Sequence, residues 1–512
     1  MGATMKPHKI LSLSALALGL LPAPAAFAGL IVNPAIDVIG NLALSDFTNN
    51  QYGTQAYKDW GNEPSVAVNP TNPNDIWISS FSFGTSVTTT GANVFYSTNG
   101  GSSWTSQFSI PAPASGVGIP NDWRFAYDSA GNLHGAILGG CNATCNVYQG
   151  STANPTSLAA WTYTGGGTPI NDVASRNNAD QPWIAVSGNT VFVAYDDFHS
   201  NTGERVAVST NGGATFTVDN AINNGAQANS VNPGTRIAVD STGGVYSIFG
   251  VGTPTATDGV NNVTYYLNRS RDGGVTWDFN GSSAIGGILI TSGVSTQLCN
   301  SCTQASNNWF AHVNDLRGNV TAIAPDSSGN HVYALIGKQD ANGVNRIYLE
   351  SYVASGTNLV KTNEIVISPN GQQAALPAIT VKADGTVVMM YETVDANGRV
   401  HVHFASSDDF GATISSDIDE YDFTPLSLLA ATGSTTANRE FGDYVYLTSI
   451  GNTFYGTFAG LGDVNSGGIN TTGLIDPFLV IGTDSIPEPS SIALLLPALL
   501  GFFYFRRRYA SG

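Results

Sequence analysis

The sequence predicts an all-β protein built as a single β-propeller of four-stranded blades. Only 11% of its 512 residues are charged, while 58 glycines supply turns, which is typical of β-structure with many short loops. Two short turn motifs recur along the chain. Since a chain of this length exceeds the usual size of one hydrophobic core, a repeated small unit is the simplest architecture.

The first recurring motif is a polar turn with the pattern Ser-x-Asp/Asn-x-Gly-x-x, followed by an aromatic or aliphatic residue. The Asp or Asn side chain bonds nearby backbone amides and the glycine accepts a positive φ, so each copy predicts a tight hairpin. The closing apolar residue begins the return strand and is expected to be buried. The four copies are Ser97-Asn99-Gly101-Trp104, Ser209-Asn211-Gly213-Phe216, Ser270-Asp272-Gly274-Trp277 and Ser407-Asp409-Gly411-Ile414.

The second motif is a short apolar strand, a turn rich in Asp, Ser and Gly, and another apolar strand, which together predict a second hairpin. An inner hairpin followed by an outer one gives the four strands of a propeller blade. Seven copies favour seven blades, and six is the alternative because the last copy is degenerate. The copies start at Val66, Phe125, Ile184, Ile237, Ile323, Ile379 and Leu447.

The repeats occupy residues 60–482, which we expect to form the propeller. Residues 29–59 precede them, and the segment LIVNPAIDVIGNLAL near residues 30–44 could supply the strand that closes the ring. Residues 1–28 combine two lysines, an apolar run and the small-x-small end Ala26-Phe27-Ala28, which is the pattern of a cleaved signal peptide. The chain is therefore expected to be exported.

The tail, residues 483–512, contains Pro487-Glu488-Pro489, an apolar stretch at 492–505 and the basic end Arg506-Arg507-Arg508. The apolar stretch predicts a short transmembrane sorting helix, below the roughly 20 residues that span a bilayer unaided. This tail resembles the PEP-CTERM sorting signal of Gram-negative bacteria. The resemblance implies transient insertion in the inner membrane, processing by an exosortase in addition to signal peptidase, and delivery to the cell surface or an extracellular matrix. An ordinary C-terminal anchor is the alternative.

The net charge argues against one class of binding partner, and the cysteine spacing predicts local cross-links. A formal net charge of −18 without a basic stripe argues against nucleic acid, because phosphate backbones are repelled. Two close cysteine pairs, Cys141/Cys145 and Cys299/Cys302, predict local disulfides in an exported chain, with a four-thiolate zinc site as the alternative.

No cofactor or metal is predicted. Acidic loops such as Asp196-Asp197 could hold calcium through oxygen ligands, but no spacing matches a calcium-loop consensus. His401 and His403 lie two residues apart and are expected on the same face of one strand. They could bind a metal as a pair, but ordinary strand residues are the simpler interpretation.

The polar turn resembles the Asp box, or BNR repeat, of sialidases and their many non-sialidase relatives, and the resemblance covers roughly residues 60–482. It implies a sialidase-like propeller in which the box is a structural turn at the rim, remote from the central pocket. Sialidases carry an Arg-Ile-Pro signature before the first box, whereas this chain reads NEPSVAV there. The catalytic roles of that family are therefore not transferred.

Four of the few arginines directly precede or begin the inner strands, where a propeller opens its central channel. The planar fork of arginine matches a carboxylate, and flat indole rings suit sugar faces. The candidate ligand-binding residues are Arg124, Arg236, Arg317, Arg439, Trp123 and Trp183. Sialidases use a Tyr nucleophile activated by Glu and an Asp acid, for which the candidates here are Tyr444, Glu440, Asp122 and Asp180.

These residues support three functions. The first is a surface or matrix propeller that binds glycans or exopolysaccharide, in particular acidic sugars, without catalysis. The second is a sialidase-like exo-glycoside hydrolase, and the third is a protein-binding propeller. A purely structural alternative is that the Arg and Asp residues pair with one another and tie the inner strands together. No GxSxG or GxxxxGK[ST] motif supports a serine hydrolase or nucleotide use.

Overall fold

The structure is a computed structural model. It describes residues 29–40, 63–80, 92–114, 117, 122–141, 144–155, 160–171, 178–198, 203–222, 235–255, 260–277, 279, 287–296, 318–424, 442–462, 465–466, 469–470 and 475–484. The predicted signal peptide and the predicted sorting helix lie outside these residues. Within the described ranges, no helix is long and apolar enough to cross a membrane.

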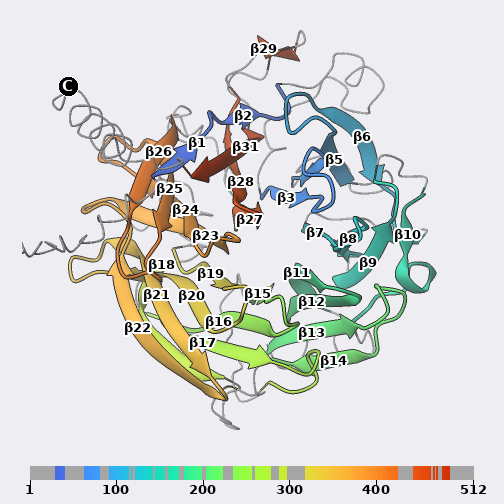
Figure 1. Cartoon of the computed structure of the whole chain (residues 1–512), viewed down its shortest axis with the longest axis horizontal. Coiled ribbons are helices and arrows are strands. Elements are labelled where there is room, and N and C mark those ends of the chain that lie inside the picture. The colour runs from blue at the N-terminus through green and yellow to red at the C-terminus, as the bar shows by residue number, and fades with distance from the viewer. Residues whose placement is uncertain are drawn as a thin grey trace, which may run out of the picture. The chain divides into compact units, whose positions relative to one another are not determined.

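Residues Gly29–Asp484 form one compact unit in which seven antiparallel sheets follow one another around a central axis (Figure 1). This confirms the predicted all-β propeller of four-stranded blades and decides for seven blades rather than six. Each inner strand contains one of the seven motif starts predicted from the sequence.

The first four blades are numbered in chain order, each from its inner to its outer strand. Blade 1 contains β3 (Ser65–Val68), β4 (Ile76–Ser79), β5 (Ala92–Ser97) and β6 (Thr105–Ile110); blade 2 contains β7 (Trp123–Tyr127), β8 (Leu133–Gly139), β9 (Asn146–Thr152) and β10 (Thr162–Tyr163), followed by the 3-10 helix η3 (Thr164–Gly166). Blade 3 contains β11 (Ala179–Ser187), β12 (Thr190–Asp197), β13 (Gly203–Ser209) and β14 (Val218–Ala221); blade 4 contains β15 (Arg236–Val239), β16 (Val245–Pro254), β17 (Val260–Ser270) and β18 (Ile288–Thr296).

The other three blades complete the ring. Blade 5 contains β19 (Thr321–Pro325), β20 (His331–Gln339), β21 (Asn345–Ser355) and β22 (Asn358–Val366); blade 6 contains β23 (Gln373–Val381), β24 (Val387–Val394), β25 (Val400–Ser407) and β26 (Ser416–Phe423). Blade 7 contains β27 (Tyr446–Ile450), β28 (Thr453–Leu461), β31 (Ile475–Asp484) and, on its outer side, β1 (Leu30–Val32) and β2 (Ile36–Asp37). A small hairpin, β29 (Asn465–Ser466) and β30 (Ile469–Asn470), stands apart.

Blade 7 takes its outer strand from the other end of the chain. Leu30 pairs with Asp484 and Val32 with Gly482, and β2 continues along the same partner strand. Pro34 lies between these two short strands, where its missing N–H interrupts the ladder. The segment singled out in the sequence as a closing strand thus holds both chain ends of the ring together.

Buried apolar side chains form seven clusters, and each lies between two neighbouring blades. Every sheet therefore buries both faces, which explains why so long a chain contains so small a share of charged residues. Each sheet is left with two edges, its inner strand at the central channel and its outermost strand at the rim.

The four polar turns share one hydrogen-bonding pattern. In the first, the Ser97 hydroxyl donates to Asn99 Oδ1 at 2.9 Å and accepts the N–H of Gly101 at 2.8 Å. The corresponding Ser-to-Gly bonds measure 2.8 to 3.0 Å in the other three turns. All four turns connect the third and fourth strands of a blade, in blades 1, 3, 4 and 6.

The last glycine of each polar turn also fits against the third strand of the preceding blade. A Cβ on it would approach Leu479 of β31, Gln149 of β9, Val208 of β13 or Ser351 of β21, taking the four turns in chain order. The closing residues Trp104, Phe216, Trp277 and Ile414 join the apolar clusters between the same pairs of blades. The turns therefore join neighbouring blades as well as strands.

The third turn offers a matched test of this packing. Gly273 and Gly274 both have a left-handed φ, +73° and +83°, but a Cβ on Gly273 meets open space, whereas one on Gly274 would lie 2.7 Å from Val208 Cγ2. Gly273→Ala should cost about 1–2 kcal/mol through φ alone. Gly274→Ala should cost about 1–3 kcal/mol more, because it also overpacks the contact. Urea unfolding of both variants measures the difference, and equal losses would contradict the inter-blade role.

Candidate functional site

Four residues from different blades converge at the end of the propeller where the inner strands begin. Arg124 of β7 lies with its Cζ 3.3 Å from the ring centre of Tyr444 and 4.3 Å from that of Trp183 on β11. Arg236 of β15 lies 4.3 Å from the Trp183 ring centre as well. The two guanidinium groups therefore meet around one indole. These four residues are called the arginine–aromatic cluster below.

Neither arginine of the cluster forms an ion pair with a carboxylate of the described residues. Arg124 Nη1 donates to the Trp123 carbonyl at 3.2 Å, and Arg236 Nη1 donates to the Thr235 carbonyl at 3.3 Å. None of the ion pairs among the described residues includes either of them. Arg124 is only 1% exposed, and its Nε and Nη2 find no hydrogen-bond acceptor in the described part of the chain. The structural alternative of Arg–Asp pairing therefore receives no ion pair from Arg124 or Arg236, and Arg317 and Arg439 lie outside the described residues.

The cluster places two positive charges close together away from water. Burial, and after it the charge of Arg124, lowers the pKa of Arg236 to about 10. Stacking on the faces of Trp183 and Tyr444 offsets part of that cost. The charges of Asp196 and Asp443 oppose this lowering of the pKa but do not outweigh it. The arrangement is thus electrostatically suited to an incoming anion.

Gln181 orders one side of the cluster and was not singled out in the sequence as a site residue. It has a left-handed φ of +51° just before Pro182, at a bulge in the pairing of β11 with β12. A bulge re-aims a side chain, and here it carries Gln181 Nε2 to Asp443 Oδ2 of blade 7 at 2.6 Å, while Gln181 Oε1 accepts from Arg236 at 3.3 Å. Glu63, at φ +50° before Pro64, accepts the Asp443 N–H at 3.0 Å.

Tyr444 is held by Asp122, and its predicted partner Glu440 lies outside the described residues. The Tyr444 hydroxyl donates to Asp122 Oδ1 at 3.2 Å. Burial raises the pKa of Tyr444 well above its usual value, and the opposing effect of Arg124 is smaller. A tyrosine that must attack as its phenolate needs the opposite shift. The described geometry therefore does not provide an activated nucleophile here.

A buried carboxyl pair, Asp196 and Glu204, lies next to Arg236. The two residues face each other across β12 and β13, and burial raises the pKa of both. Glu204 Oε2 accepts the backbone N–H of Thr235 at 3.1 Å and also its hydroxyl, so the pair fixes the residue that precedes Arg236. The sequence analysis considered Asp196 only as a calcium ligand. The feature that could have revealed the carboxyl pair is the presence of one acidic residue on each side of the same hairpin turn.

The remaining candidates fall in several places. Trp123 packs in the apolar cluster between blades 1 and 2 with Trp77 and Phe125, away from the ring of Trp183. Asp180 lies opposite Asp196 and accepts the N–H of Gln181 at 3.0 Å. The last three candidates, Arg317, Arg439 and Glu440, lie outside the described residues.

A cavity of about 290 Å³ runs along the inner strands of blades 2 to 7. Trp183, Arg236 and Tyr444 line it at the beginning of these strands, and short apolar residues such as Ala185, Ala322 and Ala378 belong to its wall farther along. It therefore reaches the arginine–aromatic cluster from the central channel. A volume near 300 Å³ is at the lower end for small-molecule sites and suits one sugar ring rather than a chain.

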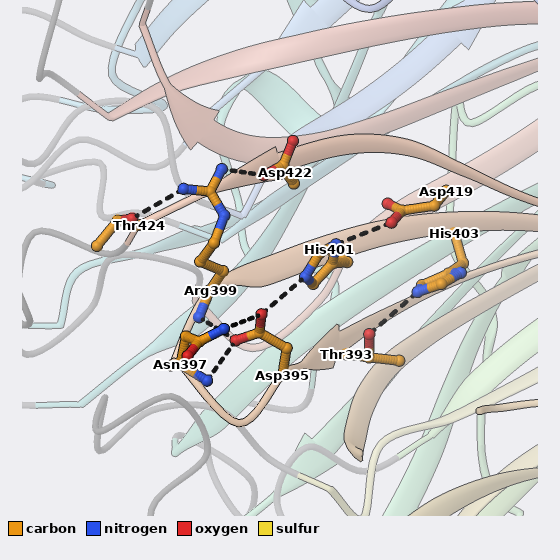
Figure 2. A network of polar contacts seen from close by, with 9 residues as sticks. All are labelled: Thr393, Asp395, Asn397, Arg399, His401, His403, Asp419, Asp422 and Thr424. Atoms are coloured by element: carbon orange, nitrogen blue, oxygen red, sulfur yellow. Dashed lines mark hydrogen bonds and ion pairs between the residues drawn. The ribbon is translucent and has the colours of Figure 1, made fainter. Parts of the chain in front are cut away.

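The structure also shows where one cysteine pair and the two strand histidines lie. Cys141 and Cys145 form a disulfide, so these thiols are not zinc ligands; Cys299 and Cys302 lie outside the described residues. His401 points to Asp419, with Nδ1 2.8 Å from Oδ2, whereas His403 approaches the Thr393 hydroxyl at 3.0 Å (Figure 2). No group of three metal-ligating side chains occurs among the described residues.

Comparison with protein-family models found no match to this chain, and comparison with curated proteins found none either. Solved structures do match. A protein of unknown function from Dyadobacter fermentans is 13% identical, with a TM-score of 0.41 over 71% of this chain and 94% of that chain. A Hadza microbial sialidase is 11% identical, with a TM-score of 0.38 over 70% of this chain and 65% of that chain.

An α-L-arabinofuranosidase from Fusarium graminearum, in complex with an iminosugar inhibitor, is 9% identical to this chain. Its TM-score is 0.45 over 88% of this chain and 97% of that chain. Similarity at this level assigns neither an activity nor a ligand to the protein.

Proposed function

We propose that the protein binds acidic glycans by holding a sugar carboxylate at the arginine–aromatic cluster, and that it does not hydrolyse them. The observation that carries the proposal is the meeting of two buried guanidinium groups around Trp183, neither of which forms an ion pair among the described residues. A planar carboxylate accepts two parallel hydrogen bonds from one guanidinium. It would bind Arg236, which lines the cavity, and relieve the repulsion between Arg124 and Arg236.

The shape and chemistry of the channel support a sugar as the carrier of that carboxylate. Arg236 and the rings of Trp183 and Tyr444 line the same cavity, so a charged fork and aromatic faces are available side by side. Aromatic rings cover the C–H face of a sugar while a few polar groups fix its orientation. A uronic or ulosonic acid residue presents both features in one ring.

Binding without hydrolysis is favoured over glycosidase activity by the state of Tyr444. Burial raises its pKa, which disfavours the phenolate that a nucleophile needs. Asp196 and Glu204, the acid pair nearest Arg236, bond to the backbone of Thr235 and are not among the residues that line the cavity. They act as positioning residues for Arg236.

The proposed biological setting follows from the sequence of the chain ends. Export through the inner membrane, processing by signal peptidase and an exosortase, and retention at the cell surface or in the matrix are predictions from residues 1–28 and 483–512. An exopolysaccharide containing acidic sugars would then be the natural ligand.

Affinity electrophoresis in gels containing alginate, a polyuronate, tests the proposal. The protein should be retarded in alginate, and Arg236→Ala should weaken binding at least tenfold, because a charge-assisted bidentate contact contributes about 1.5–3 kcal/mol. Arg236→Lys keeps the charge but loses the fork, so it should fall between the two. Thermal unfolding of each variant establishes that it is folded.

Arg399→Ala is the matched control, because Arg399, just before β25, pairs with Asp422 of β26 in blade 6 (Figure 2). It should bind alginate as the unaltered protein does. Equal retardation of the Arg236→Ala protein, the Arg124→Ala protein and the unaltered protein would refute the carboxylate site. Release of fluorophore from a fluorogenic sialoside, abolished by Tyr444→Phe, would instead establish the hydrolase alternative.

A further inference from the structure

The fourth polar turn differs from the other three at one residue. Phe410 stands where the others carry Gly100, Gly212 and Gly273, and it keeps their left-handed conformation, with φ +60° against +67° to +73°. This region is sterically unfavourable for an aromatic residue, and only glycine enters it freely. A bulky side chain in this conformation is a backbone outlier, and such outliers cluster at functional sites.

Burial does not account for Phe410, since its side chain is 61% exposed. Its ring stacks on His331 of the neighbouring blade 5, with ring centres 4.7 Å apart and an angle of 28°. His331 is itself fixed, because its Nδ1 lies 2.8 Å from Asp326 Oδ2. The ring of Phe410 is therefore supported from one side and open to solvent elsewhere, and its left-handed backbone restricts how it can move.

The surroundings of this ring are polar and negatively charged. Burial opposes ionisation of Asp326 and Asp409, but hydrogen bonds outweigh it and lower the pKa of both. Both carboxylates are thus ionised at neutral pH, and each already accepts hydrogen bonds within its own turn; Ser328 and Asn330 beside them are exposed. Such groups accept sugar hydroxyls and repel a sugar carboxylate.

We propose that Phe410 and His331 form a stacking platform for a neutral pyranose ring of a glycan. A protein interface would require a contiguous apolar centre, and no other exposed large apolar side chain of the described chain lies on these two turns. A single supported aromatic ring edged with acceptors is sufficient for one sugar ring. Because successive strands are antiparallel, both turns lie at the opposite strand ends from the arginine–aromatic cluster.

This second site is independent of the carboxylate site, and one variant tests it. Phe410→Gly restores the residue of the other three turns, so the protein should unfold at a higher urea concentration. At the same time, its affinity for hydroxyethyl cellulose, a neutral polysaccharide of pyranose rings, should fall at least tenfold. Retardation in gels that contain this polysaccharide measures the affinity. The retardation of the variant in alginate should not change.

Leu289→Ser is the matched control, because Leu289 is equally exposed, at 58%, but lies on the outer strand of blade 4. It should leave retardation in hydroxyethyl cellulose unchanged. A Phe410→Gly protein that is less stable than the unaltered one would make Phe410 a structural residue and overturn the proposal. The proposal also fails if the unaltered protein is not retarded, or if Phe410→Gly is retarded equally. Arg236→Ala should leave this binding intact, so failure of one site is distinguishable from failure of the other.

Discussion

Replacing Glu392 with Gln is expected to stabilise the protein by about 4–5 kcal/mol at pH 9 and to change its stability little at pH 4. Glu392 lies on β24 in blade 6 and is completely buried. Neither of its carboxyl oxygens has a hydrogen-bond partner among the described residues. Burial raises its pKa from 4.5 to about 8.

The direction of this effect follows from proton binding. Between pH 4.5 and 8 the folded protein keeps the proton on Glu392, whereas the unfolded chain has released it, so folding takes up a proton. The contribution of this residue to stability is therefore fully present below the unfolded pKa and is lost as the pH rises through the folded pKa. Glutamine has nearly the same shape as the protonated acid and carries no proton to lose, so its contribution is independent of pH.

Urea unfolding at pH 4, 7 and 9 measures this dependence. Glu364 on blade 5 is the matched control with the opposite sign: despite partial burial, contacts with Lys361 and Lys338 lower its pKa to about 2. Glu364→Gln should therefore destabilise the protein at neutral pH and lose that effect as the pH falls towards 2. If the Glu392→Gln difference were constant from pH 4 to pH 9, the buried carboxyl would not be the source of the pH dependence.

The architecture was accessible from the sequence because turn chemistry is local. A Ser hydroxyl that caps the amide of a glycine four residues later requires only neighbours in the chain, so all four polar turns could be read directly, as in Ser97 and Gly101. The seven inner hairpins, with polar turns after the third strands of blades 1, 3, 4 and 6, then indicated the four-stranded blade. The number of blades followed from counting inner strands, including the degenerate one at β27, whose start at Leu447 lies within it.

The candidate site was accessible only in part, because it depends on which way a side chain points. Trp123 and Arg124 are adjacent on β7, and successive residues of a strand point to opposite faces. At most one of the two side chains could therefore reach the site, and the structure places Trp123 in the core between blades 1 and 2. Strand alternation alone would have separated these two candidates.

Other parts of the site depend on long-range geometry that no sequence pattern specifies. Gln181 reaches Asp443, 262 residues away, only because a bulge redirects it and because seven blades bring blade 3 opposite blade 7. Asp196 and Glu204 become neighbours through the register of β12 and β13. The cluster thus uses residues from blades 2, 3, 4 and 7, and its geometry requires a closed ring.

Ring closure predicts the second large effect: Gly482→Ala should destabilise the protein by at least about 3 kcal/mol. Gly482 lies in β31 between β28 and β1, and a Cβ on it would be 2.1 Å from Phe454 Cζ and 2.6 Å from the Ile31 carbonyl oxygen. Phe454 is fully buried in the cluster between blades 6 and 7. The ring of Phe454 has no free space to enter, and the backbone of Ile31 must leave its pairing position.

Thr483→Ala is the matched control, because Thr483 is the next residue of the same strand, pairs with Ile31 and is exposed; its loss should stay within about 0.5 kcal/mol. Urea unfolding measures the stability of both variants. At a temperature where the Gly482→Ala protein is partly unfolded, its alginate binding should fall in proportion to the folded fraction, because Tyr444 and Arg124 reach each other only in the closed ring. A Gly482→Ala protein as stable as the Thr483→Ala protein would mean that β1 contributes little to closure, and that β27, β28 and β31 alone hold blade 7 against blade 1.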